Sequence, residues 1–189
     1  GRKNTINPPL FGWAELESFE ITGDTSRFKM VLPVLEKYAD WLNRKGTVEQ
    51  ANGDNWIKYG RKSTSEHGLF WNTKLGSGMD NIPLKGNGWV DMSSQMVILY
   101  KNIARMHKIL DNSQKSKHYQ DKAKKLGNRI NQYCWNEEDG IYYNVDSTGQ
   151  QLKSKSIANF WPLLAGIASE KQSESLVNHL TDSTEFWRK

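Results

Sequence analysis

The chain has 189 residues, which is enough for one domain with a sizeable core, and its eight Trp, seven Tyr and six Phe supply much of the area that folding can bury. The net charge is +5. The basic residues between Lys101 and Arg129 alternate with apolar ones at helical spacing, which favours a solvated helix face over a nucleic-acid site. A single cysteine, Cys134, excludes an internal disulfide and a cysteine metal site. No apolar run reaches the length of a membrane span, so we expect neither nucleic acid nor membrane as a partner.

The first quarter of the chain predicts two helices. Asn7-Pro8-Pro9 is typical of a helix start, and the apolar residues after it predict a helix that ends near Gly23. Asp24, Thr25 or Ser26 can cap a second helix. Its apolar residues repeat at helical spacing as far as Gly46, and Pro33 near its start can bend it.

Residues 66–95 have neither a helical nor a strand period, and they hold five of the 15 glycines. A long irregular segment in a compact domain is usually a working loop or disordered, and the aromatic residues Trp71 and Trp89 argue against disorder. Glycines and a proline place Asp80 and Asn81 on a constrained turn. One acidic group among aromatic rings is a pattern typical of a carbohydrate site, although Asp and Asn also serve simply to form turns.

The second half of the chain predicts four more helices. Asp91 caps a third helix, and a fourth follows the break at Asp111-Asn112. Residues 136–149 interrupt the helical period and suggest a short β-ribbon. A fifth helix begins around Ser154–Ile157 and continues through Ile167, and a sixth covers about residues 170–181. The six helices form three hairpins, so we expect an all-α fold with a long functional loop.

Four segments, in order along nearly the whole chain, resemble inverting glycosidases with an (α/α)6 toroid. The longest is Trp71–Gln95, where Gly-Ser-Gly-Met-Asp-Asn-x-Pro is followed by Trp-Val-Asp-Met-Ser-Ser-Gln; the others are residues 7–13, 135–143 and 160–166. This group includes processing α-glucosidases and mannosylglycerate hydrolases. Their toroid has six hairpins, so the resemblance implies that residues 1–189 form about half of such a catalytic domain, with the remainder missing.

The resemblance implies an exo-acting hydrolase of α-linked glucosides or mannosides, with inversion at the reacting carbon. Inversion needs a protonated carboxyl group and a second carboxylate that activates water. Asp80 matches the family's general acid. The family's base is a later glutamate without a counterpart here, so we expect this chain alone to be inactive. Other carboxylates that could stand in are Glu15, Glu17, Asp54 and Asp91.

A sugar site also needs rings for the C–H faces and polar groups for the hydroxyls. The candidate rings are Trp13, Trp71, Trp89 and Trp161, and the candidate polar groups are Asn72, Asn81, Asp91 and Gln95. Each has a plainer interpretation: Trp13 and Trp161 are more simply core residues, and Asp91 is more simply a helix cap. We expect no metal and no cofactor. No signal peptide is visible, which leaves cytoplasmic, periplasmic and secreted locations open. The alternative function is a non-catalytic helical module that binds carbohydrate or protein.

Overall fold

The computed structural model describes residues 8–43, 68–70, 88–146 and 148–186. These residues are mostly helical, which confirms the all-α class. The helices are α1 (Phe11–Thr22), α2 (Ser26–Asn43), α4 (Val90–Ile109), α5 (Ser113–Cys134), the short 3-10 helix η1 (Ile157–Phe160), α6 (Trp161–Leu164) and α7 (Glu170–Thr181).

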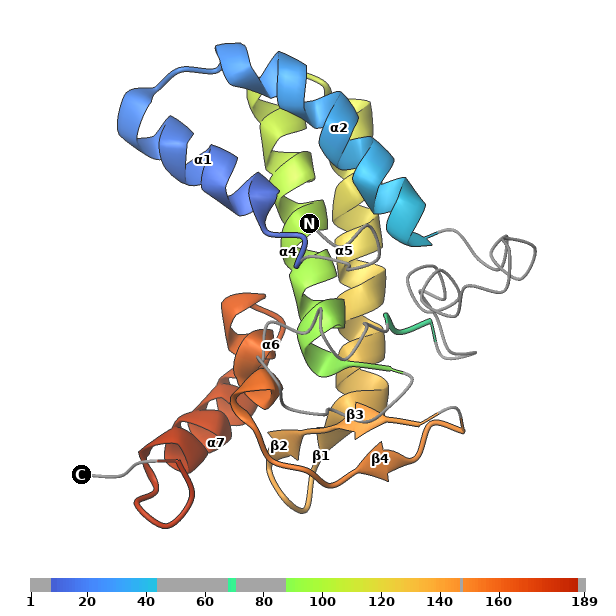
Figure 1. The fold of residues 1–189 in the computed structure, drawn as a ribbon, viewed down its shortest axis with the longest axis vertical. Helices are drawn as coiled ribbons and strands as arrows, with labels where there is room; N and C mark the ends of the chain where they lie inside the picture. The colour runs from blue at the N-terminus through green and yellow to red at the C-terminus, as the bar shows by residue number, and fades with distance from the viewer. Residues whose placement is uncertain (1–7, 44–67, 71–87, 147, 187–189) are drawn as a thin grey trace, which may run out of the picture.

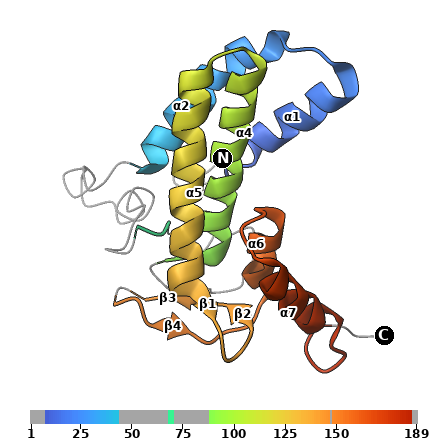
Figure 2. The same cartoon turned by 180° about the vertical axis from the view of Figure 1, so that it is seen from behind.

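The long helices α4 and α5 form an antiparallel pair that is the axis of the molecule (Figures 1 and 2). The chain reverses between them at the predicted break, where Asp111 has a positive φ of 56°. The side chain of Asn112 then caps α5 by accepting a hydrogen bond from the backbone N–H of Lys115. This predicted hairpin is confirmed.

Helices α1 and α2 diverge as a V and each packs against α4 (Figure 1). Helix α1 ends at Gly23, whose left-handed φ of 68° lets its N–H reach Phe19 O at 2.7 Å. The Asp24 carboxylate then accepts hydrogen bonds from the N–H and the hydroxyl of Ser26, at 2.7 and 2.9 Å, where α2 begins. Both predicted helices are confirmed, and Gly46 lies outside the described residues.

Two short antiparallel ribbons follow α5, where a single ribbon was predicted. Strand β1 (Trp135–Asn136) pairs with β2 (Ile141–Tyr142), and β3 (Asn144–Val145) pairs with β4 (Gln151–Leu152). Figure 1 shows both ribbons below the end of α5 that lies near the start of α4. They therefore lie at the same end of the molecule as the first turn of α4.

The predicted fifth helix, through Ile167, is wrong in extent. Helix η1 leads into α6, which stops at Leu164. The chain then turns at Gly166, whose φ of 58° is outside the helical region. Helices η1 and α6 together cover residues 157–164, so the helical segment before α7 is shorter than predicted. Helix α7 itself is confirmed, and it begins with a capping box between Ser169 and Gln172.

Helix α4 is the centre of the core, because it contacts α1, α2, α5, α6 and η1. Every residue from Val90 to Tyr100 is buried, so this half of the helix has no solvent-facing side. None of the described helices is long and apolar enough to cross a bilayer. The half of α4 that starts at Val90 is buried although it carries several polar side chains.

The close packing at the start of α4 leaves no room for a side chain at Gly88. An added Cβ would lie 2.8 Å from both Leu69 Cδ1 and Val145 Cγ2. We expect Gly88→Ala to lower the free energy of unfolding by ~1–3 kcal/mol through overpacking, measured by urea denaturation. The control is Gly127→Ala within α5, where the one close contact is Ile167 Cγ2 at 3.0 Å and alanine is the better helix former. Equal losses of unfolding free energy in the two variants would contradict overpacking as the cause at Gly88.

Candidate functional site

The first turn of α4 is held in place by segments that are distant in sequence. Trp89 N–H donates to Phe70 O at 2.8 Å, and Phe70 N–H donates to Ser93 Oγ at 2.9 Å. Gly88 and Val145 exchange a pair of backbone hydrogen bonds at 3.0 and 2.9 Å. Phe70 and Gly88, the described residues that flank 71–87, are thus fixed against α4 and β3.

The N-terminus of α4 receives its side-chain cap from another part of the chain. The residue at the N-cap position, Trp89, makes no side-chain cap hydrogen bond. Instead the Oδ1 atom of Asn144, on β3, accepts from the N–H of Val90 at 2.9 Å. Asn144 was missed by sequence reasoning, because a partner 54 positions away leaves no local signal. It connects the β3–β4 ribbon to the turn that carries Asp91.

Asp91 is not the N-cap, contrary to the sequence interpretation; it lies in the first turn of α4 and is fully buried. Neither carboxylate oxygen has a hydrogen-bond partner among the described residues. Burial raises the pKa of Asp91 to about 7. The backbone N–H groups of Met92 and of Asp91 itself lower that pKa in part, although neither meets the geometry of a hydrogen bond. Asp91 is thus a carboxyl group that can change charge near neutral pH.

Other polar atoms on the same helix are buried without a partner in the described part of the chain. They are Ser94 Oγ, Gln95 Oε1 and Asn102 Nδ2. The spacing i, i+3, i+4 places Asp91, Ser94 and Gln95 on one face of α4. Buried polar groups in proteins are nearly always hydrogen-bonded, so a face with several unpaired ones is a candidate binding surface. We call Asp91, Ser94 and Gln95 the α4 polar face.

The remaining predicted site residues differ in where the structure places them. Trp71, Asn72, Asp80 and Asn81 lie outside the described residues. Trp89 is 1% exposed and belongs to the core, which favours its packing interpretation. The core interpretation is wrong for Trp13, which is 37% exposed on α1 and donates from Nε1 to Glu17. Trp161 packs, partly buried, against the core, as its plainer interpretation predicted.

Two of the four carboxylates that could stand in as a base are engaged by other side chains. Glu15 forms a two-pronged ion pair with Arg27, at 2.6 and 2.8 Å, and this arrangement lowers the pKa of Glu15. Glu17 accepts from the Trp13 ring at 2.8 Å. Asp54 lies outside the described residues. Of these four residues, Asp91 is the one that the structure shows buried and unpaired.

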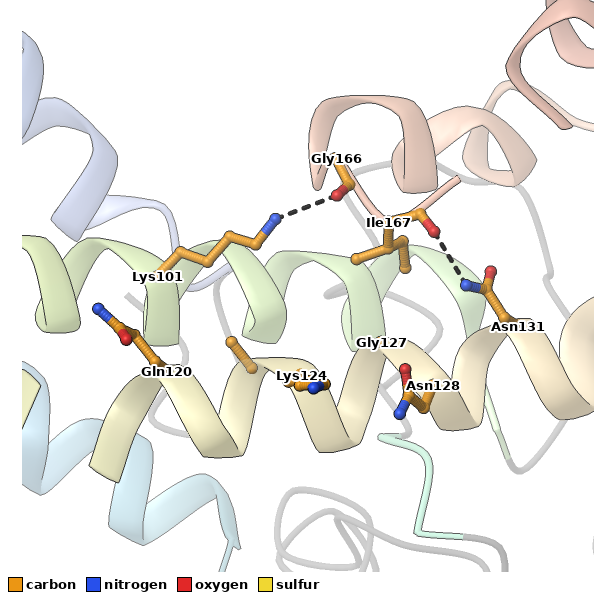
Figure 3. Close-up of a pocket in the computed structure, with 9 residues that line it drawn as sticks. Lys101, Gln120, Lys124, Gly127, Asn128, Asn131, Gly166 and Ile167 are labelled. Carbon is orange, nitrogen blue, oxygen red and sulfur yellow. Dashed lines mark hydrogen bonds between the residues drawn. The ribbon is translucent and has the colours of Figure 1, made fainter. Parts of the chain in front are cut away.

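A separate pocket of about 360 Å³ lies between α4, α5 and the turn after α6 (Figure 3). Lys101 Nζ donates to Ala165 O at 2.5 Å and to Gly166 O at 3.2 Å, and Asn131 Nδ2 donates to Ile167 O at 2.9 Å. Burial lowers the pKa of Lys101. Lys101 is ten residues beyond Asp91, or about 15 Å along the helix. These donors attach the turn at residues 165–167 to the α4–α5 pair. The polar side chains of the pocket that make these bonds therefore have a structural role.

The described residues contain no group of three or more His, Cys, Asp or Glu side chains that could hold a metal ion. Cys134 is completely buried, and burial raises the pKa of its thiol far above the usual value. A thiol in that state is a poor nucleophile. The described side chains of the α4 polar face carry carboxyl, hydroxyl and amide groups.

Comparisons with known proteins point to carbohydrate hydrolysis. A family model described as Trehalase matches residues 86–188, which include all of α4. An uncharacterized protein of Borreliella burgdorferi is 29% identical over 185 residues, or 97% of this chain. Cytosolic neutral trehalases of Pyricularia oryzae and Kluyveromyces lactis are 44% and 38% identical over 57 and 60 residues, about 30% of this chain.

The matched stretches span 35% of the Borreliella burgdorferi protein and 8% of each trehalase, so this chain covers only a small part of its relatives. The matches support the expected resemblance to (α/α)6-type glycoside hydrolases. The narrower resemblance to processing α-glucosidases and mannosylglycerate hydrolases stays a prediction.

The raised pKa of Asp91 predicts a stability that depends on pH. Between about pH 4 and pH 7 the unfolded chain ionises Asp91 while the folded chain keeps its proton, so folding stability falls as the pH rises. A difference of about three pKa units corresponds to at most ~4 kcal/mol. Asp91→Asn cannot ionise, so its stability relative to the native chain should rise by ~2–4 kcal/mol from pH 4 to pH 8 in urea unfolding.

The matched control for that measurement is Asp121→Asn, because Asp121 is exposed on α5 and has only a long ion pair to Lys117. Its stability relative to the native chain should hardly change with pH. An Asp91→Asn difference that is the same at pH 4 and pH 8 would show that Asp91 is ionised in the folded state.

The hydrogen bond between Asn144 and Val90 leads to a second prediction, on the stability of the first turn of α4. Asn144→Ala removes the acceptor for Val90 N–H and should lower the free energy of unfolding by ~1–2 kcal/mol, whereas Asn144→Asp retains an acceptor oxygen and should lose less. Hydrogen exchange at Val90 should quicken in the alanine variant. Unchanged exchange at Val90 would exclude Asn144 as the cap of α4.

Proposed function

Because the chain belongs to the trehalase family, we propose that residues 1–189 form part of an (α/α)6 catalytic domain in a glycoside hydrolase. The observation that carries the proposal is the α4 polar face, which lies within the matched residues and holds a buried carboxyl group that has no partner in the part of the chain that the structure describes. An unpaired polar cluster is costly to bury, and a sugar supplies hydroxyl groups that can pair with it. The domain would act on the terminal unit of its substrate.

The proposed reaction is hydrolysis with inversion, in which Asp80 is the general acid. Asp80 would protonate the leaving oxygen while a second carboxylate activates water on the opposite side of the sugar ring. Support for Asp80 comes from its motif and from the anchoring of both flanks of residues 71–87 beside Asp91. Since Glu15 and Glu17 are engaged on α1, we assign the base to another part of the protein.

The proposed substrate is an α-linked glucoside, with trehalose as the first choice because two of the relatives are named trehalases. An α-linked mannoside is the second choice. Asp91 and Gln95 would accept hydrogen bonds from sugar hydroxyls, and such bonds would lower the pKa of Asp91 because they stabilise its charged form. Asp91 has no exposed surface, so a sugar reaches it only when part of its cover moves.

A second candidate function is a non-catalytic module that binds carbohydrate through the same face. The observation in its favour is that, of the carboxylates named as a possible base, Glu15 and Glu17 are already engaged by Arg27 and Trp13 on the described part of the chain. The two candidates differ in one requirement, because hydrolysis needs a second carboxylate across the site and binding does not.

Hydrolysis of trehalose, other α-linked disaccharides and aryl α- and β-glycosides should be measured with the product of the complete reading frame. We expect turnover of an α-glucoside, and Asp80→Asn should lower kcat by at least a hundredfold because it removes the proton donor. The control is Asp121→Asn, which should retain full activity.

A complete protein that hydrolyses none of these substrates, but binds sugars in a way that Asp91→Ala abolishes, would favour the binding module. Activity that survives Asp80→Asn would remove Asp80 from the mechanism. Turnover by the 189-residue chain alone would place both carboxyl groups within it.

A further inference from the structure

The pocket between α4, α5 and the turn at residues 165–167 has a lining that its structural hydrogen bonds use only in part (Figure 3). Its volume of about 360 Å³ is near the lower end of the roughly 300–1,000 Å³ that small-molecule sites occupy. Of the nine described residues that line it, six belong to α5, two belong to the turn, and Lys101 comes from α4. The pocket therefore has room for one small molecule among three elements.

The α5 side of the pocket is one continuous face of that helix. Its residues recur at spacings of three and four positions, which places them on the same side: Gln120, Ala123, Lys124, Gly127, Asn128 and Asn131. The small residues of this face, Ala123 and Gly127, are buried. Space therefore remains beside the longer polar side chains of the same face.

The lining is rich in hydrogen-bond donors. It contains two ammonium groups and three side-chain amides, whereas none of the nine described lining residues is Asp or Glu. None of the nine is aromatic either, although rings are the usual partners of the apolar faces of a sugar. This lining therefore suits an anionic group better than an uncharged sugar.

Lys101 carries a positive charge that no carboxylate balances in the described part of the chain. Its ammonium group has three N–H donors, and the carbonyls of Ala165 and Gly166 accept from two of them. Burial lowers the pKa of Lys101, and no negative charge among the described residues opposes that effect. An anion in the pocket would supply the missing charge and accept from the third donor.

Lys124 and Asn128 add donors on the exposed side of the pocket. Neither side chain forms an ion pair or a hydrogen bond with another described residue. Because they are four positions apart on α5, both can reach the same group in the pocket. With Lys101 they supply donors from two helices around one space.

We propose that this pocket binds a small molecule through a phosphate group, which accepts hydrogen bonds from Lys101, Lys124 and the Asn128 amide. A phosphate monoester carries about −1.5 to −2 charges at pH 7 and has three strong acceptor oxygens, which matches two ammonium groups and an amide. Lys101 lies about 15 Å along α4 from Asp91, so this site is separate from the α4 polar face. The bound molecule links α4, α5 and the turn, and it stabilises the fold because it binds only the folded chain.

The test is calorimetric titration of the product of the complete reading frame at constant ionic strength. The probes are glucose 6-phosphate, inorganic phosphate and uncharged glucose. Glucose 6-phosphate should bind saturably, and Lys124→Gln should weaken its binding by about tenfold or more, because a hydrogen bond to a charged group is lost. Asn128→Asp should abolish the binding, because it places a carboxylate beside the phosphate. Tighter binding of glucose 6-phosphate than of inorganic phosphate would identify an ester as the ligand, and equal binding would identify free phosphate.

The matched control is Lys125→Gln, which removes the same charge from the next residue of α5. Lys125 is exposed and does not line the pocket, so this variant should retain the native affinity. Equal weakening by Lys125→Gln and Lys124→Gln would show general attraction to a basic helix face and would overturn the proposal. So would the absence of saturable phosphate binding at millimolar concentrations, or a binding of glucose that Lys124→Gln weakens equally. Thermal unfolding of each variant checks that it is folded, and hydrolysis is measured separately.

Discussion

The structure depends on the complete burial of the first half of α4. Every side chain from Val90 to Tyr100 is inside the protein, so both apolar and polar positions of this helix must be accommodated by neighbours. The apolar positions are satisfied by packing against the surrounding helices. The polar positions divide into two kinds, because Ser93 is paired with Phe70 whereas Asp91, Ser94 and Gln95 are not paired within the described residues. That difference distinguishes the structural face of the helix from the candidate binding face.

A buried helix end also needs partners for its free N–H groups, and the solution found here shapes the site. Asn144 caps α4 from the β3–β4 ribbon, and Gly88 pairs with Val145 on the same strand. The ribbon is therefore needed to finish the helix, and the helix fixes the ribbon. Phe70 joins the same network through Trp89 and Ser93, which brings the two flanks of residues 71–87 to one place. The order of the site comes from these long-range backbone contacts.

Sequence reasoning located the helices well where the signal is local. The glycine at 23, the break at Asp111-Asn112 and the start of α7 each depend on a cap formed within a few residues, and each was predicted. Sequence reasoning failed where a contact between distant residues determines how a helix begins or ends. Asp91 has the sequence of an N-cap, but Asn144 performs that task. Ile167 was placed in a helix, but the chain turns at Gly166 and the Ile167 carbonyl is held by Asn131 instead.

Trp13 shows the same limit for surface position, because helical spacing alone does not tell which neighbours a ring will find. It lies exposed beside Glu17 on α1, whereas Trp89, preceding α4, is buried in the core. The candidate site was found only in part for a similar reason. Asp91 and Gln95 were named from a motif, but their lack of partners is a property of the folded chain.

Asp91 and His179 show how hydrogen-bond balance separates a candidate binding group from a structural one. At Asp91 two acceptor oxygens lack donors among the described residues, so burial favours the neutral acid, and any molecule that brings donors will stabilise the charged form. At His179 the two ring nitrogens lie 2.8 Å from Glu185 Oε2 and from the backbone oxygen of Asp139, so neither nitrogen is left for a ligand. A buried group that lacks hydrogen-bond partners is available to bind a ligand, whereas a group with all of its hydrogen bonds made has a structural role. By that criterion α4 carries the candidate sugar-binding groups among the described residues, whereas His179 on α7 serves to attach that helix.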